Sequence, residues 1–429
     1  MDPDRRSVFY DVKRRIRKGK SEDLFVQFAR LAGYNGVAAA LLFALHVIMA
    51  RLLGPAQYAD YGVVIALLLT FLVSATSIQL IITRFISYHQ SRNQPEQITY
   101  LVRKSLKWSF AGGLGLFVLT LVLAQPISEF LQLDNFIAVV LLGFVLWFTV
   151  MQPVFEGAFR GYEQFGELGR MRLIEASLRL VFVTIFVLAG FAISGAVFGL
   201  GLGTFVALAF SYKHLYRLQK RKSTVPNMAR IRRYAVPVIL SMVSFSLLLN
   251  LDLILVRHYF SAAEAGVFAA ASFLAKAPVF VSLVFVGVLF PRVTQMHAQG
   301  KNSVSVLRSA LVAVTSVMLV TTLLSFFFAD WLLTFIFGAS YTIGPVLGFY
   351  VFGMSALAIG MLLVVYMLAL QKDRVAFALP LFVFALIGLL GLFHASLTQV
   401  ILVVLFVLVS FAAYVVYCAR DFLEFDYFL

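Results

Sequence analysis

Long apolar runs recur along the whole chain and are separated by short polar connectors. Each run is about 20 residues long, which is the length that a helix needs to cross the hydrocarbon layer of a bilayer. We therefore predict an all-α polytopic membrane protein, and no connector is long enough to fold as a separate domain. The runs predict about twelve membrane-spanning helices, at residues 24–50, 60–86, 108–127, 135–157, 170–190, 192–212, 234–256, 264–290, 307–328, 342–370, 375–394 and 397–418.

Two similar polar interruptions indicate that the chain is built from two halves. "ARLLGPAQYADYGVV" at 50–64 and "VRHYFSAAEAGVFAAAS" at 256–272 each separate the first two runs of a half. Six is an even number, so both halves run in the same direction, and parallel repeats of this kind bind substrate between two lobes. Chance similarity between apolar helices is the alternative. The predicted segments are a basic cytoplasmic N-terminal segment (1–23), an N-lobe with helices one to six (24–212), a basic cytoplasmic linker (213–233), a C-lobe with helices seven to twelve (234–418) and a cytoplasmic tail (419–429).

The positive charge lies on one side of the predicted membrane. The chain is 62% apolar and 13% charged, and its formal net charge is +15. Of its 35 Lys and Arg residues, 29 fall in the connectors and terminal segments of one side, whereas the other side holds only Arg51 and Arg257. The positive-inside rule places the basic side in the cytoplasm, where anionic lipid headgroups attract it. The charge therefore indicates contact with membrane lipids and excludes nucleic acid as a partner.

This topology predicts that both termini lie in the cytoplasm. A reporter enzyme fused after Leu429 is expected to show cytoplasmic activity, because an even number of spans returns the chain to its starting side. An enzyme that works only outside the cytoplasm provides the matched fusion and is expected to be inactive there. Activity of that second fusion would mean an odd number of spans, and the parallel repeat would then be wrong.

The sequence lacks the motifs of the common catalytic and metal sites. Cys418 is the single cysteine, which excludes an internal disulfide and a Cys-based metal site. The sequence contains neither the GxxxxGK[ST] phosphate loop of an ATP motor nor the HExxH zinc motif. The connectors on the outer side are too short for a catalytic domain. We therefore predict a transporter that is not an enzyme and has no cofactor.

Polar residues inside the apolar runs mark a candidate substrate path, since a charge at the centre of a span costs about 2.5–3.5 kcal/mol. Lys276 lies about three turns into its run and has no evident local partner. Structural alternatives stay open, because Arg30 and Arg84 are placed to snorkel to the interface and Ser and Thr stripes often serve helix packing. The path candidates are Arg30, Asn35, Arg84, Arg179, Asn250, Asp252 and Lys276.

A second group of polar residues lies near the predicted cytoplasmic ends of the fourth and fifth spans. Gln152 and Glu156 are one helical turn apart and are placed to pair with Arg160 or Arg172, which would close the cytoplasmic side. Arg172, Glu175 and Arg179 follow one helix face, and an internal ladder of ion pairs is the structural alternative. The predicted cytoplasmic gate consists of Gln152, Glu156, Arg160, Arg172 and Glu175.

Three stretches in order resemble polysaccharide exporters. "RLLGPAQYADYGVV" resembles their first outer loop, of the form LGP-x-x-[FY]-G-x-Y, although Ala59 stands where that loop usually has Gly. "FRGYEQFGELGRMRLIEASLR", from residue 159, is similar to their RG-x-x-x-FG turn and the following E-x-x-x-R helix. "NLDLILVRHYFSAAEAGVFAAASFLAKAPVFVSLVFVGVLFPRV", 250–293, resembles the start of their second half. The chain resembles Wzx-type flippases of the multidrug/oligosaccharidyl-lipid/polysaccharide exporter superfamily over most of residues 24–420.

The resemblance implies a two-lobed bundle that moves an undecaprenyl-diphosphate-linked oligosaccharide from the cytoplasmic to the outer leaflet. It also implies a bacterial or archaeal cytoplasmic membrane, export of a surface polysaccharide, and a polysaccharide polymerase as a partner. A diphosphate needs cations along its path, and this is the role expected for Arg30, Arg84 and Lys276, and after them for Arg179. Two alternatives remain: an ion-coupled exporter of small amphipathic molecules, and a membrane glycosyltransferase or polymerase, although the latter predicts a sizeable outer loop.

Overall fold

The computed structural model describes residues 22–133, 136–218, 223–298, 302–370 and 372–423, and these residues are almost entirely helical. The predicted segments 1–23 and 419–429 therefore lie largely outside the described residues. The first half of the chain contains α2 (Glu22–Ser91), α3 (Pro95–Val122), α4 (Ala124–Phe130), α5 (Ile137–Gly161), α6 (Phe165–Phe186), the π-helical turn η1 (Val187–Phe191) and α7 (Ala192–Leu218). The second half contains α8 (Met228–Tyr259), α9 (Ala262–Ala275), α10 (Ala277–Ala298), α11 (Val304–Phe327), α12 (Ala329–Phe337), α13 (Val346–Ala369), the 3₁₀ turn η2 (Arg374–Phe377), α14 (Leu379–Leu392) and α15 (Leu397–Leu423).

The described helices confirm the all-α membrane fold. Ten of them are long and apolar enough to cross a membrane. Two of these ten candidates, of 62 and 53 residues, are long enough for two crossings each. A glycine with positive φ breaks each of them, at Gly54 (φ 70°) and at Gly190 (φ 89°). The helices thus account for the twelve predicted crossings.

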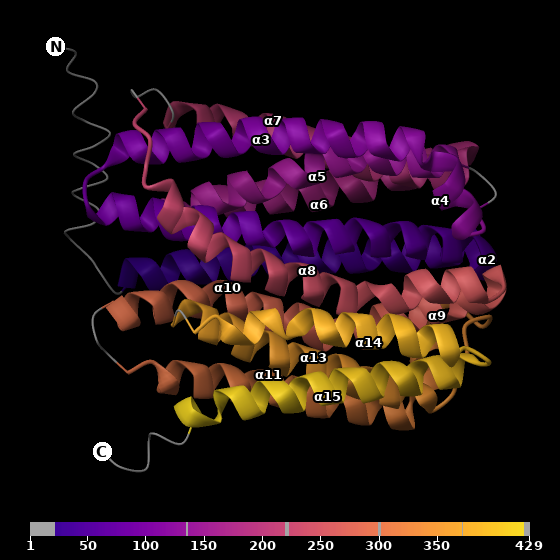
Figure 1. The fold of residues 1–429 in the computed structure, drawn as a ribbon. Coiled ribbons are helices and arrows are strands. Elements are labelled where there is room, and N and C mark those ends of the chain that lie inside the picture. Colours follow the sequence, from indigo (N-terminus) through magenta and orange to yellow (C-terminus); the bar gives the residue numbers. More distant parts are fainter. Residues whose placement is uncertain (1–21, 134–135, 219–222, 299–301, 371, 424–429) are drawn as a thin grey trace.

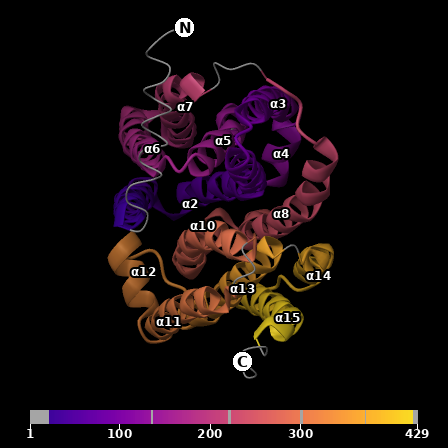
Figure 2. The ribbon, with the colours of Figure 1, turned by 90° about the vertical axis from the view of Figure 1, so that its left-hand side faces the viewer.

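The helices form two groups that meet along one seam (Figures 1 and 2). Helices α2 to α7 pack on one another, and helices α8 to α15 do the same; we call these groups the N-lobe and the C-lobe. The principal contacts between the lobes are those of α2 with α8, α9 and α12. We call the end where α2 ends and α3 begins the basic end, and the end that holds Gly54 the far end. The basic end is on the left of Figure 1.

The first connector differs from its prediction. Residues 51–59 were expected to form a loop, but they are helical on both sides of Gly54, so α2 runs from Glu22 to Ser91 with a single sharp kink. Pro55 follows the glycine directly, and its missing N–H is tolerated in the first turn of a helix. The chain therefore reverses direction at one residue, which brings the first two crossings into direct contact.

The eighth crossing is divided where the sequence predicts one run over 264–290. Ser261 caps α9 by accepting a hydrogen bond from the Glu264 backbone N–H, and the Glu264 carboxylate accepts one from the Ser261 N–H. The helix ends at Ala275, Lys276 lies at its C-cap, and α10 starts at Ala277. Pro278 follows directly, and a proline here removes a helical hydrogen bond. The break places Lys276 between two helix segments.

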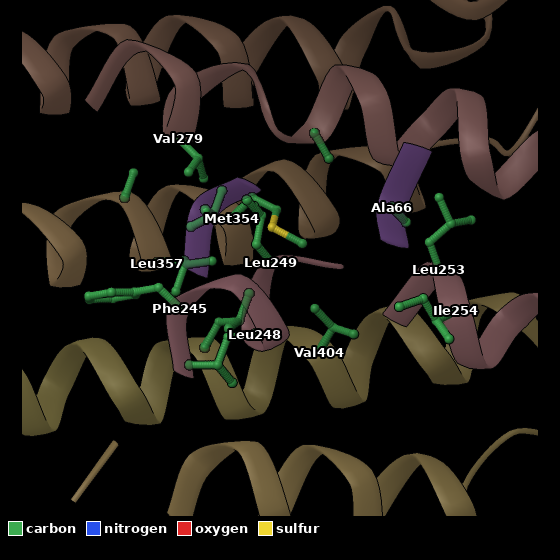
Figure 3. Close-up of a cluster of buried hydrophobic side chains, with 14 of the residues drawn as sticks. Ala66, Phe245, Leu248, Leu249, Leu253, Ile254, Val279, Met354, Leu357 and Val404 are labelled. Carbon is green, nitrogen blue, oxygen red and sulfur yellow. The ribbon is translucent and has the colours of Figure 1, made fainter. Parts of the chain in front are cut away.

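Apolar side chains fill the contacts within the C-lobe and across the seam (Figure 3). Phe245, Leu248 and Leu249 of α8 face Met354 and Leu357 of α13, and all five are almost fully buried. Ala66 reaches the same cluster from α2 of the N-lobe. Within a bilayer, helices associate through van der Waals packing of such side chains and not through their removal from water. The seam is part of the main apolar cluster.

Candidate functional site

Polar side chains from four N-lobe helices form one connected network in the basic half of the lobe. At its centre Glu156 of α5 accepts two hydrogen bonds from Arg172 of α6, from Nη2 at 2.6 Å and from Nε at 3.2 Å. Arg172 also donates to Asn35 Oδ1 of α2 at 3.1 Å. Gln79 of α2, with its amide nitrogen toward the carboxylate, donates to Glu156 at 2.9 Å and accepts from Arg160 at 3.0 Å. We call this group, with the residues of the next paragraph, the N-lobe network.

The network continues toward the middle of the lobe through a second ion pair. Gln152 donates to Glu156 at 3.2 Å and to Glu175 at 2.9 Å, which links the two pairs. Glu175 and Arg179 of α6 form a salt bridge of 2.7 Å, one turn apart. Arg179 also donates to the Thr204 hydroxyl of α7 at 2.8 Å. Of the ladder of ion pairs predicted along α6, the Glu175–Arg179 pair is present, whereas Arg172 pairs with Glu156 of α5.

The charges of the N-lobe network do not cancel. Its titratable members are three arginines, Arg160, Arg172 and Arg179, and two carboxylates, Glu156 and Glu175, so its formal charge is +1. Glu156, Glu175 and Arg179 are buried, while the Arg172 side chain keeps 28% of its exposure. Removing charges from water costs several kcal/mol per ion, which close pairing only partly offsets. Three guanidinium groups gathered in one membrane-spanning lobe supply the donors that an anion needs.

The C-lobe holds a smaller buried cluster around Lys276. Its ammonium donates to Asn250 Oδ1 of α8 at 3.2 Å, so the expectation that Lys276 has no local partner is wrong. The Tyr350 hydroxyl of α13 donates to the Asp252 carboxylate and bonds the Ser272 hydroxyl at 3.0 Å. Sequence spacing could not reveal these partners because they come from different helices. We call this group the C-lobe cluster.

Hydrogen bonds join the lobes at the far end. Arg257 of α8 donates to Asp60 of α2 at 2.8 Å and to the Gln132 carbonyl at 2.5 Å. Arg51 of α2 donates to the Phe335 and Ile336 carbonyls, which lie in the last turn of α12. We call this region the far-end seam. Arg51 and Arg257 are the two basic residues that the sequence places in outer connectors. Their position there was the only feature of the sequence that set them apart.

Small residues and a tyrosine complete the closure of the far-end seam. A Cβ added to Gly62 would lie 2.7 Å from Ala269 Cβ, and a Cβ added to Gly266 would overlap the Pro55 carbonyl. The Tyr341 hydroxyl donates to the Ala50 carbonyl at 2.9 Å. Burial raises the pKa of the Tyr341 hydroxyl above its ordinary value, so the hydroxyl remains a donor. The lobes are in backbone contact here.

The first crossing is less covered toward the basic end. Ala50 and Met49 at its far end are fully buried. Val37 is 51% exposed and Phe43 is 42% exposed, and Cβ atoms on Gly33 and Gly36 would meet no atom within 4 Å. This crossing is therefore held by the C-lobe at the far end. In its basic half one face is exposed, and the other packs on the N-lobe, where Arg172 bonds Asn35 and Leu31 is buried.

The structure separates the predicted site residues into four places. Arg179 and Asn35 belong to the N-lobe network, together with all five residues of the predicted gate. Asn250, Asp252 and Lys276 form the C-lobe cluster. Arg30 is exposed on the basic half of α2, and Arg84 stacks on Tyr234 of α8 with its guanidinium 4.0 Å from the ring centroid. The hydrogen bonds given above for the gate residues stay within the N-lobe, so their closing role remains a prediction.

No group of three or more metal-ligating side chains occurs among the described residues. Cys418, the one thiol, is partly buried in α15 and far in sequence from both polar groups. The polar groups consist of hydrogen-bonded amides, hydroxyls and ion pairs. Such an arrangement is suited to binding and releasing a charged molecule.

Solved structures show the same fold at low sequence identity. A multidrug resistance MATE family transporter of the MOP superfamily, in an inward-facing conformation, is 16% identical with a TM-score of 0.69, over 89% of this chain and 93% of that chain. A MOP superfamily transporter from Pyrococcus furiosus, described as having a binding pocket of reverse polarity, is 17% identical with a TM-score of 0.67, over 92% and 95% of the two chains. The D35N mutant of the MATE transporter VcmN from Vibrio cholerae is 17% identical with a TM-score of 0.68, over 94% and 97%.

Sequence comparison identifies the family. No curated protein matches the chain in sequence. The family model described as "Polysaccharide biosynthesis protein" matches residues 28–297, which is more than half of the chain and covers the N-lobe and the first helices of the C-lobe. The chain therefore belongs to this polysaccharide biosynthesis family, and it shares its multi-pass helical fold with the solved transporters above.

Proposed function

We propose that the protein flips an undecaprenyl-diphosphate-linked oligosaccharide from the cytoplasmic to the outer leaflet, for export of a surface polysaccharide. The observation that carries this proposal is the N-lobe network, which sets three arginines, one buried and two partly buried, against two buried carboxylates inside membrane-spanning helices. A diphosphate brings about two negative charges, and guanidinium groups bind phosphate oxygens through paired, charge-assisted hydrogen bonds. The family match supports a role in polysaccharide biosynthesis.

The arrangement of the lobes supports transport by alternating access. The far-end seam is held by hydrogen bonds and by two close glycine contacts, which are contacts that can part and reform. One face of the basic half of the first crossing is exposed. In the proposed cycle this state receives the headgroup from the basic end, while the polyprenyl tail stays in lipid. Opening of the far-end seam then releases the headgroup on the other side.

The location and partners follow from the same proposal. The basic end faces the cytoplasm of a bacterial or archaeal cell, because the connectors there hold most of the Lys and Arg residues. Membrane lipids surround the apolar surface. A polysaccharide polymerase would take the flipped lipid-linked oligosaccharide as its substrate.

A reconstituted flipping assay tests the proposal. The purified protein is placed in liposomes that contain an undecaprenyl-diphosphate-linked oligosaccharide with a fluorescent sugar, and an impermeant quencher reports the outer fraction. Protein-dependent movement of this lipid, and none of a labelled neutral phospholipid, is expected. Efflux of small amphipathic dyes without movement of the lipid-linked sugar would instead support the exporter of amphipathic molecules.

Lys276→Met is expected to abolish flipping in this assay while the protein still inserts and purifies. The lysine is buried, and an anionic headgroup gains a charge-assisted hydrogen bond from it that methionine cannot supply. Lys276→Arg keeps the charge and is expected to keep partial activity. Asn250→Ala removes the hydrogen-bond partner of Lys276 and leaves the lysine charge, so it separates the effect of this contact from the effect of the charge. Normal flipping by Lys276→Met would show that this side chain is only structural.

A further inference from the structure

Arginine and tyrosine side chains interleave at the basic end of the contact between α2 and α8. Arg84 and Tyr88 are one turn apart on α2, Arg92 follows just after this helix, and Arg230 and Tyr234 occupy the first two turns of α8. We call these five residues the Arg–Tyr cluster. The two helices lie side by side here (Figure 1). Neither the N-lobe network nor the C-lobe cluster includes any of the five.

The cluster brings like charges together. The Arg92 and Arg230 guanidinium carbons each lie 4.3 Å from the centroid of the Tyr88 ring. Arg230 also donates to the Tyr88 hydroxyl at 2.6 Å. The five side chains thus hold three cations and no carboxylate. Ring faces attract each cation, but the cations repel one another, and an anion between them would relieve that repulsion.

Two buried polar atoms of the cluster lack acceptors. Arg84 Nη1 and the Tyr234 hydroxyl have no hydrogen-bond partner within the described part of the chain. Arg84 stacks on the Tyr234 ring, so the two groups are adjacent. Leaving a buried donor unpaired is costly, and both groups are able to donate to the same acceptor. Phosphate oxygens are acceptors only, and guanidinium groups match their geometry.

The cluster is open on one side. Arg92 and Arg230 are exposed, Tyr88 is partly exposed, and Arg84 and Tyr234 are half-buried. A negatively charged group can therefore meet the exposed pair first and then reach the inner donors. Because Arg230 lies in the first turn of α8, the positive end of that helix dipole adds to the attraction.

We propose that the Arg–Tyr cluster is a binding site for the phosphate group of a membrane lipid at the basic end of the bundle. Two lipids supply this chemistry: an anionic phospholipid through its headgroup, and a polyprenyl lipid through its diphosphate. In either case the bound phosphate accepts hydrogen bonds from Arg84 and Tyr234 and bridges α2 to α8. The site joins the two lobes, and its existence does not depend on flipping.

Lipid binding to the full-length protein in detergent tests this site, with native mass spectrometry to count bound molecules. Phosphatidylglycerol is expected to bind about ten-fold more tightly than phosphatidylcholine. Arg84→Gln is expected to weaken phosphatidylglycerol binding about ten-fold, and Tyr234→Phe, which keeps the ring under Arg84, about three-fold. Arg308→Gln removes an exposed arginine from α11 at the same end and is expected to leave binding unchanged.

A competition arm distinguishes the two lipids. Displacement of phosphatidylglycerol by undecaprenyl diphosphate would assign the site to the polyprenyl lipid, and its absence would assign the site to phospholipid headgroups. Equal binding of phosphatidylglycerol and phosphatidylcholine would overturn the proposal. Wild-type binding by both Arg84→Gln and Tyr234→Phe would also overturn it. Because the assay measures binding without transport, its failure and a failure of the flipping assay are separate results.

Discussion

Gly266→Ala is expected to reduce flipping about 5- to 150-fold. The added methyl group would overlap the Pro55 carbonyl, which belongs to the backbone and has no rotamer with which to move away. Overpacking of this kind costs about 1–3 kcal/mol. If that cost falls on the closed far-end seam, the equilibrium between closed and open states shifts toward the open state by about 5- to 150-fold. The variant should therefore fold but fail to return to the closed state.

Thiol labelling reports this shift directly. In a Cys418→Ser background, a cysteine at Ala50 lies in the closed seam, where the native side chain is fully buried. An impermeant maleimide is expected to label it faster when Gly266 is changed to Ala. Gly115→Ala is the matched control, because a methyl group there meets no atom within 4 Å. Equal labelling and normal flipping by Gly266→Ala would contradict a closed seam that must reform.

Arg179→Met is expected to destabilise the protein by about 3–5 kcal/mol. The arginine is buried, pairs with Glu175 at 2.7 Å and donates to Thr204 at 2.8 Å. Its removal leaves a carboxylate with less positive charge inside a membrane-spanning lobe, and such a charge is costly. The midpoint of unfolding in detergent should fall accordingly.

A second change separates the pair from the rest of the network. Arg179→Met combined with Glu175→Gln removes both charges and is expected to recover most of the lost stability, as happens when buried ion pairs are replaced together. Glu175→Gln alone is the second single variant of this double-mutant cycle. If the two single losses simply add in the double variant, the residues act independently and the network model is wrong.

The sequence was sufficient to predict the membrane class, the number of crossings and their order. Apolar runs long enough to span a bilayer are a strong signal. The three stretches that resemble the family follow these runs in the expected order. The ends of the helices were less predictable. The first connector is helical because the chain changes direction at one glycine with positive φ, Gly54. The residue types around Gly54 do not distinguish such a kink from a loop.

The site was predictable only in its residue types. Gln152, Glu156, Arg172 and Glu175 lie together as their spacing on α5 and α6 indicated. The partners on other helices could not be predicted. Tyr350 lies 98 positions after Asp252, and spacing along one helix carries no information about such a neighbour. Asp60, which bonds Arg257 at the far-end seam, was missed for the same reason.

The kink at Gly54 has a mechanical consequence. Hydrogen bonds tie the second arm of α2 to α8 at three heights, through Asp60, Ser74 and Tyr88. The first arm, from Glu22 to the kink, has 32 residues and is about 48 Å long at 1.5 Å per residue. It is a lever whose fulcrum lies at the far end and whose tip lies at the basic end, and the hydrogen bond from Arg172 to Asn35 ties this arm to the N-lobe. A rotation of about 10° at a single glycine would carry that tip about 8 Å, nearly the width of a helix.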